Sequence, residues 1–252
     1  MNVAMMQPTF LPWQGFFELI SKSEQFVFLD DFQFSVQSYH QRNRLFVNAE
    51  RIGWYTVPIR KSISFQAPLN ETRIDETNPW RKKMWRRIQS NYSKAPYYED
   101  IGSAVHSWLF ATAQSLAEQN MDFIKRVCSL MGIEREFHLS SESHSGAKRS
   151  ERVIELLRKY KADRYCCAQG SFEYMRQDGF FPVRGVEVCF QDFKPMVYKQ
   201  INLANDFEPR LSVLDALMNV GPKVTLELIQ NGTDKWLSWQ EMINIKNSNS
   251  ES

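Results

Sequence analysis

The sequence has few glycines, few histidines and no long apolar run, and each absence removes a class of protein. Only 10 of the 252 residues are glycine, and neither a GxGxxG nor a Walker A motif occurs, so nucleotide-binding loops of both kinds lack a signature. The four histidines are scattered without the spacing of a metal site. No segment approaches the about 18 consecutive apolar residues of a membrane helix, and the N-terminus does not resemble a signal peptide, so we expect no membrane span.

Cysteine usage and net charge exclude further classes of protein and kinds of site. The chain has four cysteines, and the adjacent Cys166 and Cys167 are poorly spaced for a disulfide framework or a zinc site, which favours a cytoplasmic protein without metal. Either could be a nucleophile only if a histidine lay near it, and burial in an apolar run is the simpler interpretation. The 31 basic and 29 acidic side chains leave a net charge of +2, so any anion site must be local. Nucleic-acid binding through the basic segment 80–92 is therefore the weakest interpretation.

Aromatic residues are abundant, at 13% of the chain, with 18 phenylalanines and 7 tryptophans. Such a chain can bury a large core and can also line a pocket with rings. Short apolar runs at 3–6, 26–29, 137–139, 164–168 and 186–190 alternate with segments of helical periodicity. This alternation predicts an α/β fold with a parallel sheet and right-handed crossovers.

The predicted organisation is one domain over 1–246, with a helical insertion at about 79–132 and a disordered tail at 247–252. Within the insertion we expect helices near 80–92, 99–109 and 112–131, and near the C-terminus helices at 212–219 and 221–230. Further helices are expected after Ser145-Gly146, through about Lys161, and over 171–178. Residues 35–51 show no clear period and are predicted to be irregular, followed by a strand at 54–59.

Polar clusters follow three of the predicted strands. Ligands of open parallel sheets bind beyond the carboxyl ends of strands, so Gln7 to Trp13, Asp30 to Gln33 and Gln169 to Tyr174 are candidates for one crevice. Helix capping and backbone partners are an equally good interpretation of each cluster taken alone. Adjacent residues of an extended chain point to opposite sides, so only one of Asp30 and Asp31 should reach the crevice, and we expect Asp30.

The basic segment Arg42-Asn43-Arg44 lies near these clusters in sequence. Arg42 and Arg44 are two residues apart and would share one face of an extended chain, where their planar guanidinium groups suit a diphosphate. Asn43 would turn to the other side. A solvated basic loop is the alternative.

Several of these residues occur in a pattern that resembles the WbqC-like family. The resemblance rests on Gln7-Pro8, Pro12-Trp13-x-Gly15, Asp30-Asp31-x-Gln33, Arg42-Asn43-Arg44, Tyr165-x4-Gly170-x3-Tyr174, Tyr198-x-Gln200 and Ser212-x2-Asp215. It implies a bacterial protein of O-antigen or other surface-polysaccharide synthesis, and some members are thought to transfer glycine to a sugar. The chain departs from the pattern at Ala168-Gln169-Gly170, where the family usually has a Ser-Gly pair.

The opening strand, proline-containing turn, helix and second strand are also similar to nucleotidylyl-transferase folds. Those enzymes use a His-x-Gly-His pair, whereas this chain has Trp13-Gln14-Gly15-Phe16 in the corresponding turn. The predicted fold class is therefore a Rossmann-like, nucleotidylyl-transferase-like core with a helical insertion and C-terminal helices, without that adenylylation machinery.

Two functions remain open. The first is a glycyl or other aminoacyl transferase acting on an amino or hydroxyl group of a sugar or nucleotide-sugar, with Asp30 or Asp31 as base, and Gln7, Gln33 and Asn43 as neutral donors. Arg42 and Arg44 would hold the anion. The resemblance adds further substrate-binding candidates, which are Pro12, Trp13, Tyr165, Gly170, Tyr174, Tyr198, Gln200, Ser212 and Asp215. No cofactor is evident, and the activated glycine donor, whether an acyl carrier, an adenylate or a charged tRNA, is unknown. The second function is a binding or scaffold protein that recognises a nucleotide-sugar or lipid-linked intermediate without transforming it.

Overall fold

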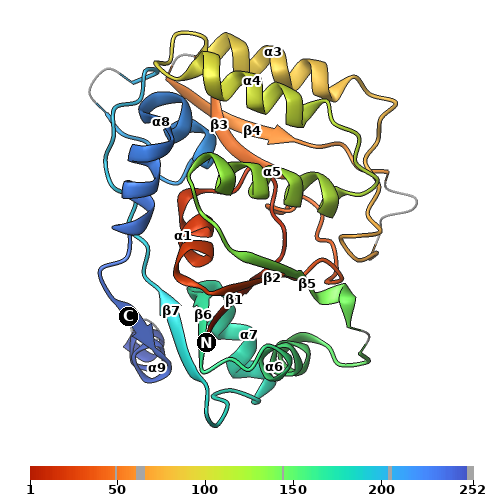
Figure 1. Ribbon diagram of the computed structural model, residues 1–252, viewed down its shortest axis with the longest axis vertical. Helices are drawn as coiled ribbons and strands as arrows, with labels where there is room; N and C mark the ends of the chain where they lie inside the picture. The colour runs from red at the N-terminus through yellow and green to blue at the C-terminus, as the bar shows by residue number, and fades with distance from the viewer. Residues whose placement is uncertain (49, 61–65, 144, 204–205, 249–252) are drawn as a thin grey trace.

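A computed structural model describes the chain except residues 49, 61–65, 144, 204–205 and 249–252. Within the described residues, a six-stranded sheet forms the centre and a two-stranded antiparallel hairpin lies apart from it (Figure 1). The central strands are β1 (Asn2–Met6), β2 (Gln25–Phe28), β5 (Glu136–Leu139), β6 (Arg164–Ala168), β7 (Glu187–Gln191) and β8 (Trp236–Ser238).

The strand order of this sheet is β5-β2-β1-β6-β7-β8. The first five strands are parallel, and only β8 pairs antiparallel, at the edge beside β7. The chain runs outward from β1 to β2 and β5, then returns to the other side of β1 for β6 and β7. This reversal between β1 and β6 is the switch point of a Rossmann-like α/β fold, and it confirms the predicted fold class.

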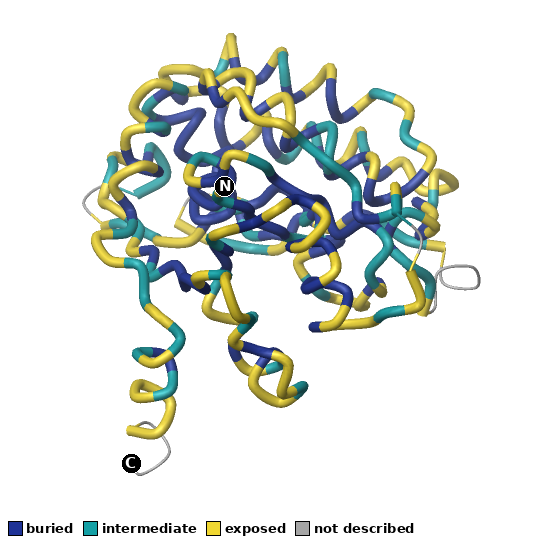
Figure 2. The backbone as a smooth tube through the Cα atoms, turned by 60° about the horizontal axis from the view of Figure 1, so that its bottom comes forward, coloured by how far each residue is buried: buried dark blue, intermediate teal, exposed yellow. Residues whose placement is uncertain are grey.

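Each face of the sheet packs against its own helices. Ala4, Phe26, Phe28 and Cys166 face the core that contains α1 (Gln14–Lys22) and α5 (Leu116–Leu130). Val3, Met5, Val27, Tyr165 and Cys167 face the second core, with α6 (Arg149–Lys159) and α7 (Phe172–Asp178). Because neighbouring residues of a strand point to opposite faces, the buried runs are apolar throughout. Figure 2 shows these strands as buried segments in the middle of the molecule.

The prediction that residues 35–51 are irregular holds for 35–41 and is wrong from Arg42 onward. Residues Arg42–Asn48 form β3, which pairs with β4 (Arg51–Thr56), and β4 begins and ends three residues before the predicted strand at 54–59. The strand was missed because polar residues interrupt its apolar pattern. These residues make contacts in the folded protein: the amide of Asn43 bonds to backbone far away in sequence, and Arg42 stacks on Trp54. A tertiary contact of this kind leaves no periodic signal.

The helices over the hairpin are α3 (Trp80–Tyr92) and α4 (Tyr98–Leu109), as Figure 1 shows at the top of the molecule. The predicted helix at 112–131 and the one predicted to follow Ser145-Gly146 both begin later than expected. Ser115 caps α5 through the N–H of Glu118, at 3.2 Å, so that helix begins at Leu116, and α6 begins only at Arg149.

The C-terminal part has one more strand and one more helix than predicted. The expected helices 212–219 and 221–230 form α8 (Val213–Gln230), which is broken where Gly221 takes a positive φ of 78° ahead of Pro222. Strand β8 and α9 (Trp239–Ser248) were not predicted, and α9 includes the first two residues of the predicted tail. Residues 249–252 lie outside the described part of the chain. Among the described helices, none has the length and apolar character needed to cross a bilayer.

Candidate functional site

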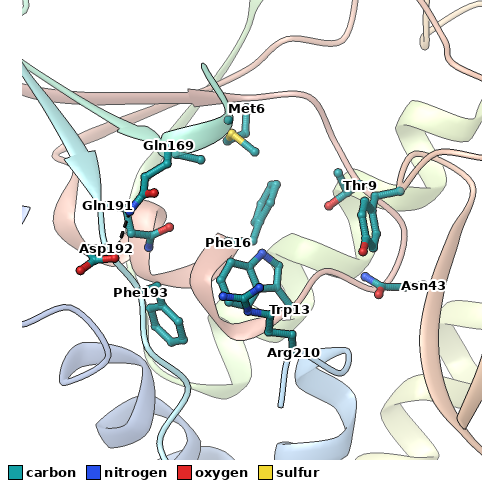
Figure 3. A pocket seen from close by; sticks show the side chains of 13 residues that line it. Met6, Thr9, Trp13, Phe16, Asn43, Gln169, Gln191, Asp192, Phe193 and Arg210 are labelled. Atoms are coloured by element: carbon teal, nitrogen blue, oxygen red, sulfur yellow. Dashed lines mark hydrogen bonds between the residues drawn. The ribbon is translucent and has the colours of Figure 1, made fainter. Parts of the chain in front are cut away.

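A cavity of about 430 Å³ opens at the carboxyl ends of β1, β6 and β7 (Figure 3). Met6, Ala168 and Gln191 are the last residues of these three strands, and each lines the cavity. The cavity therefore lies beside the switch point between β1 and β6, where α/β sheets bind their ligands. The strand-end argument thus located the region, and Trp13, Asn43 and Gly170 are the predicted residues that line it.

Aromatic rings form one wall of the cavity. Trp13 and Phe193 meet edge to face, with ring centroids 5.1 Å apart, and Phe16 and Tyr39 also line the space. The indole folds back over the first turn of α1, so a Cβ on residue 15 would lie only 2.5 Å from the ring. Pro-Trp-x-Gly is thus a structural unit, in which glycine at 15 makes room for the ring of Trp13.

The opposite side of the cavity carries polar groups at the ends of β6 and β7. The Gln169 amide nitrogen donates to Asp192 at 3.0 Å. The Gln191 amide nitrogen donates to the Gly15 carbonyl at 2.8 Å and to the Glu18 carboxylate at 2.6 Å. Glu18 is fully buried on α1, and burial raises the pKa of its carboxyl group. The amide nitrogen of Gln191 is therefore fully engaged inside the protein.

One cation lines the cavity. Arg210 is exposed, and its guanidinium has no hydrogen-bond or ion-pair partner within the described part of the chain. Arg210 adopts a positive φ of 60° in the segment that leads to α8. This segment is joined to the loop after β1, because Val213 N–H donates to the Pro12 carbonyl at 2.8 Å.

Asn43 holds the loop that carries Trp13. Its side-chain nitrogen donates to the carbonyls of Leu11, at 2.8 Å, and Phe10, at 3.3 Å. Its oxygen accepts from the N–H of Arg44 at 2.8 Å. Leu11 has a positive φ of 45°, so this loop follows an uncommon path that the buried amide of Asn43 stabilises. Pro12 is buried in the same loop.

Gln7 pairs with a buried histidine rather than lining the cavity. His40 accepts from the Ser35 N–H through Nδ1 at 3.2 Å, so its Nε2 carries the proton and donates to Gln7 Oε1 at 3.1 Å. Burial lowers the pKa of His40 from 6.5 to about 4, which keeps the ring neutral near pH 7.

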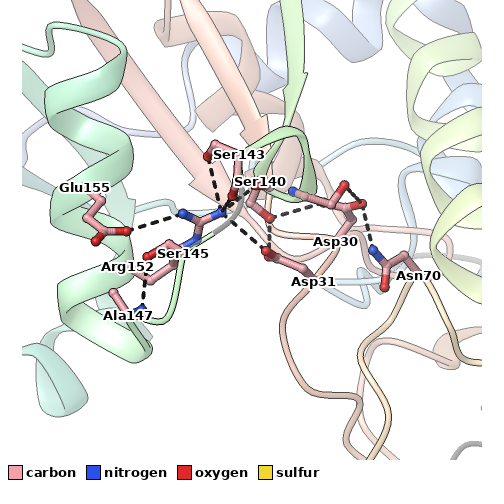
Figure 4. Close-up of polar contacts among 10 residues, drawn as sticks. Asp30, Asp31, Asn70, Ser140, Ser143, Ser145, Ala147, Arg152 and Glu155 are labelled. Atoms are coloured by element: carbon pink, nitrogen blue, oxygen red, sulfur yellow. Dashed lines mark hydrogen bonds and ion pairs between the residues drawn. The ribbon is translucent and has the colours of Figure 1, made fainter.

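Asp30 is buried beneath the turn that follows β5 (Figure 4). One carboxylate oxygen accepts from Ser141 N–H at 3.1 Å and lies 3.1 Å from Ser140 Oγ, whose single hydrogen can go to Asp30 or to Asp31. The other accepts from Ser141 Oγ at 2.7 Å and from Asn70 Nδ2 at 3.3 Å. Both carboxylate oxygens of Asp30 are therefore engaged inside the protein. The expectation that Asp30 reaches the crevice is wrong in its geometry, because β5 and its turn cover this side chain.

Asp31 lies on the open side instead. Its carboxylate accepts from Ser140 Oγ and lies 3.4 Å from the buried guanidinium of Arg152 (Figure 4). Asp31, Gln33 and Arg152 line a separate cavity of about 590 Å³. The structure thus places Asp30 and Asp31 beside β2 and β5, away from Trp13, and of the two only Asp31 lines that separate cavity.

Arg42 and Arg44 share one face of β3, and Asn43 turns to the other, as the spacing predicted. Neither arginine lines the cavity that holds Trp13. The guanidinium of Arg42 lies 4.3 Å from the centre of the Trp54 ring, and Arg44 forms an ion pair with Glu208 at 3.3 Å. Both cations already have partners within the protein.

The predicted tyrosines do not reach the cavity. Tyr165 is buried on the opposite face of the sheet, and Tyr174 packs against the same core. Tyr198 donates to Asp215 at 2.7 Å and has a pKa well above 10 because it is buried. These three rings have structural partners.

Asp215 is the centre of a buried polar cluster at the start of α8. Besides Tyr198, it accepts from Tyr92 OH at 2.7 Å and from Gln200 Nε2 at 2.8 Å. Burial raises the pKa of Asp215. Ser212 caps the helix by accepting from the N–H of Leu214 at 3.3 Å. The last part of the family pattern therefore stabilises the start of α8 and the segment that leads to it.

No cluster suited to a metal ion occurs in the described residues. All four cysteines are buried and free, and burial raises the pKa of the Cys166 and Cys128 thiols to about 12. High pKa values disfavour the thiolate, so these side chains are unsuited to nucleophilic catalysis.

Sequence reasoning missed the cavity residues from the last residue of β7 to the start of α8. These are Gln191, Asp192, Phe193 and Arg210, together with Thr9, Phe16, Tyr39 and Gln169 within segments that had been noted. Applying the strand-end argument to the predicted strand at 186–190 would have found Gln191 and Asp192. Arg210 had no such signal.

Comparison with known proteins agrees with the pattern of motifs. The model of the WbqC-like protein family matches residues 7–226. The uncharacterized protein Rv1507c of Mycobacterium tuberculosis is 30% identical over 226 residues, which cover 87% of this chain and 94% of that protein. No solved structure matches. With the Trp13 loop, the strand-end residues and the Asp215 cluster all inside the matched region, this chain belongs to the WbqC-like protein family.

Proposed function

We propose that the protein transfers a glycyl or other aminoacyl group to an activated sugar, with the sugar bound in the cavity beside Trp13. The observation that carries the proposal is the composition of this cavity, in which aromatic rings face amide and carboxylate groups. Ring faces contact the apolar side of a sugar, and amides bond to its hydroxyl groups. A volume of about 430 Å³ accommodates a sugar with part of a nucleotide.

Arg210 supports a phosphate-bearing substrate. It is the cation of this cavity, and it lacks a partner among the described residues, so a phosphate would not have to displace an existing ion pair. The anion role that the sequence suggested for Arg42 and Arg44 moves, in this proposal, to Arg210.

Asp192 is the carboxylate best placed to act as the base. In the proposed step, the lone pair of an acceptor nitrogen or oxygen attacks the glycyl carbonyl carbon and forms the new bond. The bond between that carbon and the leaving group of the donor breaks, and the leaving group departs with the electron pair. The acceptor proton passes to Asp192, which is partly exposed and can release it to solvent. The donor is an activated glycine, such as a thioester, an adenylate or glycyl-tRNA.

The proposal assigns this reaction to the synthesis of O-antigen or another surface polysaccharide, the role that the resemblance to the family implies. The proposal includes a cytoplasmic location, since nucleotide-sugars and aminoacyl donors are made there.

The test is incubation with a panel of nucleotide-sugars and the three kinds of glycine donor, followed by mass measurement of the sugar. We expect a gain of one glycyl unit with at least one pair. Asp192→Asn should lower the rate about 100-fold or more while the sugar still binds. Glu151→Gln, an exposed carboxylate on α6, serves as the matched control.

A binding or scaffold protein is the second candidate. It is favoured by one observation, which is that no histidine or cysteine lines this cavity within the described ranges. Sugar binding without mass gain for any donor would support this function and overturn the transferase.

A further inference from the structure

Gln191 presents one end of its amide to the protein and the other to the cavity. Both hydrogens of its nitrogen are used inside, by the Gly15 carbonyl and the Glu18 carboxylate. Glu18 and the Gly15 carbonyl can only accept, so the amide cannot turn over without placing two acceptors against its own oxygen. The free end toward the cavity is therefore the carbonyl oxygen (Figure 3).

Gln169 is oriented in the same way. Its nitrogen donates to Asp192, which leaves the carbonyl oxygen on the cavity side without a partner among the described residues (Figure 3). Together with the carboxylate of Asp192, the two amide oxygens form a row of acceptors at the ends of β6 and β7. Asp192 also lies 3.6 Å from the exposed ammonium of Lys194, which does not line the cavity, and the Gln169 nitrogen keeps one further hydrogen. Acceptors therefore predominate at this edge, which favours ligand groups that bring hydrogen-bond donors.

Glu18 adds negative charge behind this row. Its side chain is fully buried, and it has no ion-pair partner in the described chain. One carboxylate oxygen accepts from Gln191 and from Thr233 Oγ at 2.5 Å, whereas the other, Oε1, is buried without a hydrogen-bond partner among the described residues. Lys22 acts on this carboxylate only through space and forms no ion pair with it in the described part of the chain, so Glu18 favours positive charge in the adjoining cavity.

We infer that the edge formed by Gln169, Gln191 and Asp192 is a subsite for a primary amine, and that the sugar bound by this protein is an amino sugar. The inference rests on the proposed function and specifies its acceptor. An ammonium group offers three donors, which matches three acceptor side chains, whereas a hydroxyl offers one. Glu18 is a positioning residue: it fixes the orientation of the Gln191 amide, and its negative charge attracts a cation into the cavity without contact with the ligand.

The experiment compares D-glucosamine, D-glucose and N-acetyl-D-glucosamine at pH 7 by NMR titration of the ¹⁵N-labelled protein. We expect glucosamine to bind about tenfold more tightly than the other two and to shift the side-chain amide signals of Gln169 and Gln191. Glu18→Gln should remove most of this preference, because an amide at 18 can donate and lets Gln191 turn over.

Because Glu18 is buried and its substitution could disturb folding, two further variants change exposed positions instead. Gln169→Met removes one acceptor at an exposed position and should lower the preference for the amine by about threefold. Glu187→Gln, an exposed carboxylate on the same strand as Gln191, should leave the preference unchanged.

The possible failures are distinct. Equal affinity for the three sugars, no response to any of them, or a preference that survives Glu18→Gln would overturn the amine subsite. Glycyl transfer to sugars without an amine would overturn the subsite and leave the transferase intact. A preference for glucosamine without transfer from any donor would leave the subsite intact and overturn the transferase.

Discussion

The indole ring of Trp13 occupies the space that a side chain at position 15 would need. A Cβ on Gly15 would lie 2.5 Å from Cζ2 and 2.7 Å from Cη2 of the ring. Because the same ring forms a wall of the cavity and contacts Phe193, the glycine controls the shape of the binding site from outside it.

Gly15→Ala should therefore damage both stability and binding. Displacing a packed indole costs about 1–3 kcal/mol, which exceeds the gain of up to about 1 kcal/mol in helix propensity. Urea denaturation and sugar titration measure the two effects. Gly146→Ala is the control, because a Cβ at that position meets no atom within 4 Å. Unchanged binding in Gly15→Ala would show that the ring of Trp13 does not contact the ligand.

Asp30→Asn should destabilise the fold more than Asp31→Asn. An amide at 30 has one acceptor oxygen and cannot accept the hydrogen bonds that now reach both carboxylate oxygens, and hydrogen bonds to a charged group contribute about 1.5–3 kcal/mol each. We expect a loss of about 3 kcal/mol for Asp30→Asn and about 1 kcal/mol for the partly exposed Asp31, measured by urea denaturation. A fully stable Asp30→Asn variant without activity would restore this carboxylate to a direct role.

His40 should make the protein less stable in mild acid. The pKa of the ring is about 4 in the folded state and 6.5 as its ordinary value, so the unfolded chain binds a proton in this range and the folded chain does not. Stability therefore falls as the pH drops from 6.5 towards 4, by about 3 kcal/mol for this group, and the effect levels off below pH 4. The difference in unfolding free energy between the wild type and His40→Gln, followed across this range, measures it. A difference that does not change with pH would contradict the prediction.

Arg210→Ala should lower the binding affinity for a phosphate-bearing sugar by about tenfold, because one charge-assisted contact is lost. The weakening should shrink as salt is added. Arg42→Lys and Arg44→Lys should change affinity less, because Trp54 and Glu208 already occupy these cations. Calorimetry with a nucleotide-sugar compares them, and Arg176→Ala, an exposed arginine on α7, is the control. A larger loss in Arg42→Lys than in Arg210→Ala would return the anion site to β3.

Local pattern was enough to predict the five parallel strands of the central sheet, because strands such as β1, β2 and β6 are buried on both faces and form apolar runs in the sequence, whereas β8 was not predicted. Local pattern failed at β3, because the polar side chains of Asn43 and Arg42 are held by contacts with distant residues, which give the sequence no apolar alternation. The same limit applies to the site. The strand-end argument found Trp13 and Gly170, but Asp30 is covered by Ser140 and Ser141, which lie about 110 positions later in the chain. A local sequence pattern cannot show whether a distant segment of the chain covers a given strand end.

The central position of β1 has a consequence for how the chain is made. One edge of β1 pairs with β2, which follows within about 20 residues, whereas the other edge pairs with β6, at Arg164 to Cys166. During synthesis that second edge has no partner until about two thirds of the chain has emerged. An apolar strand with an open edge is prone to join another chain. The slow step of folding should therefore be the closure of β6 onto β1, and variants that weaken β6 should aggregate while being synthesised rather than after they have folded.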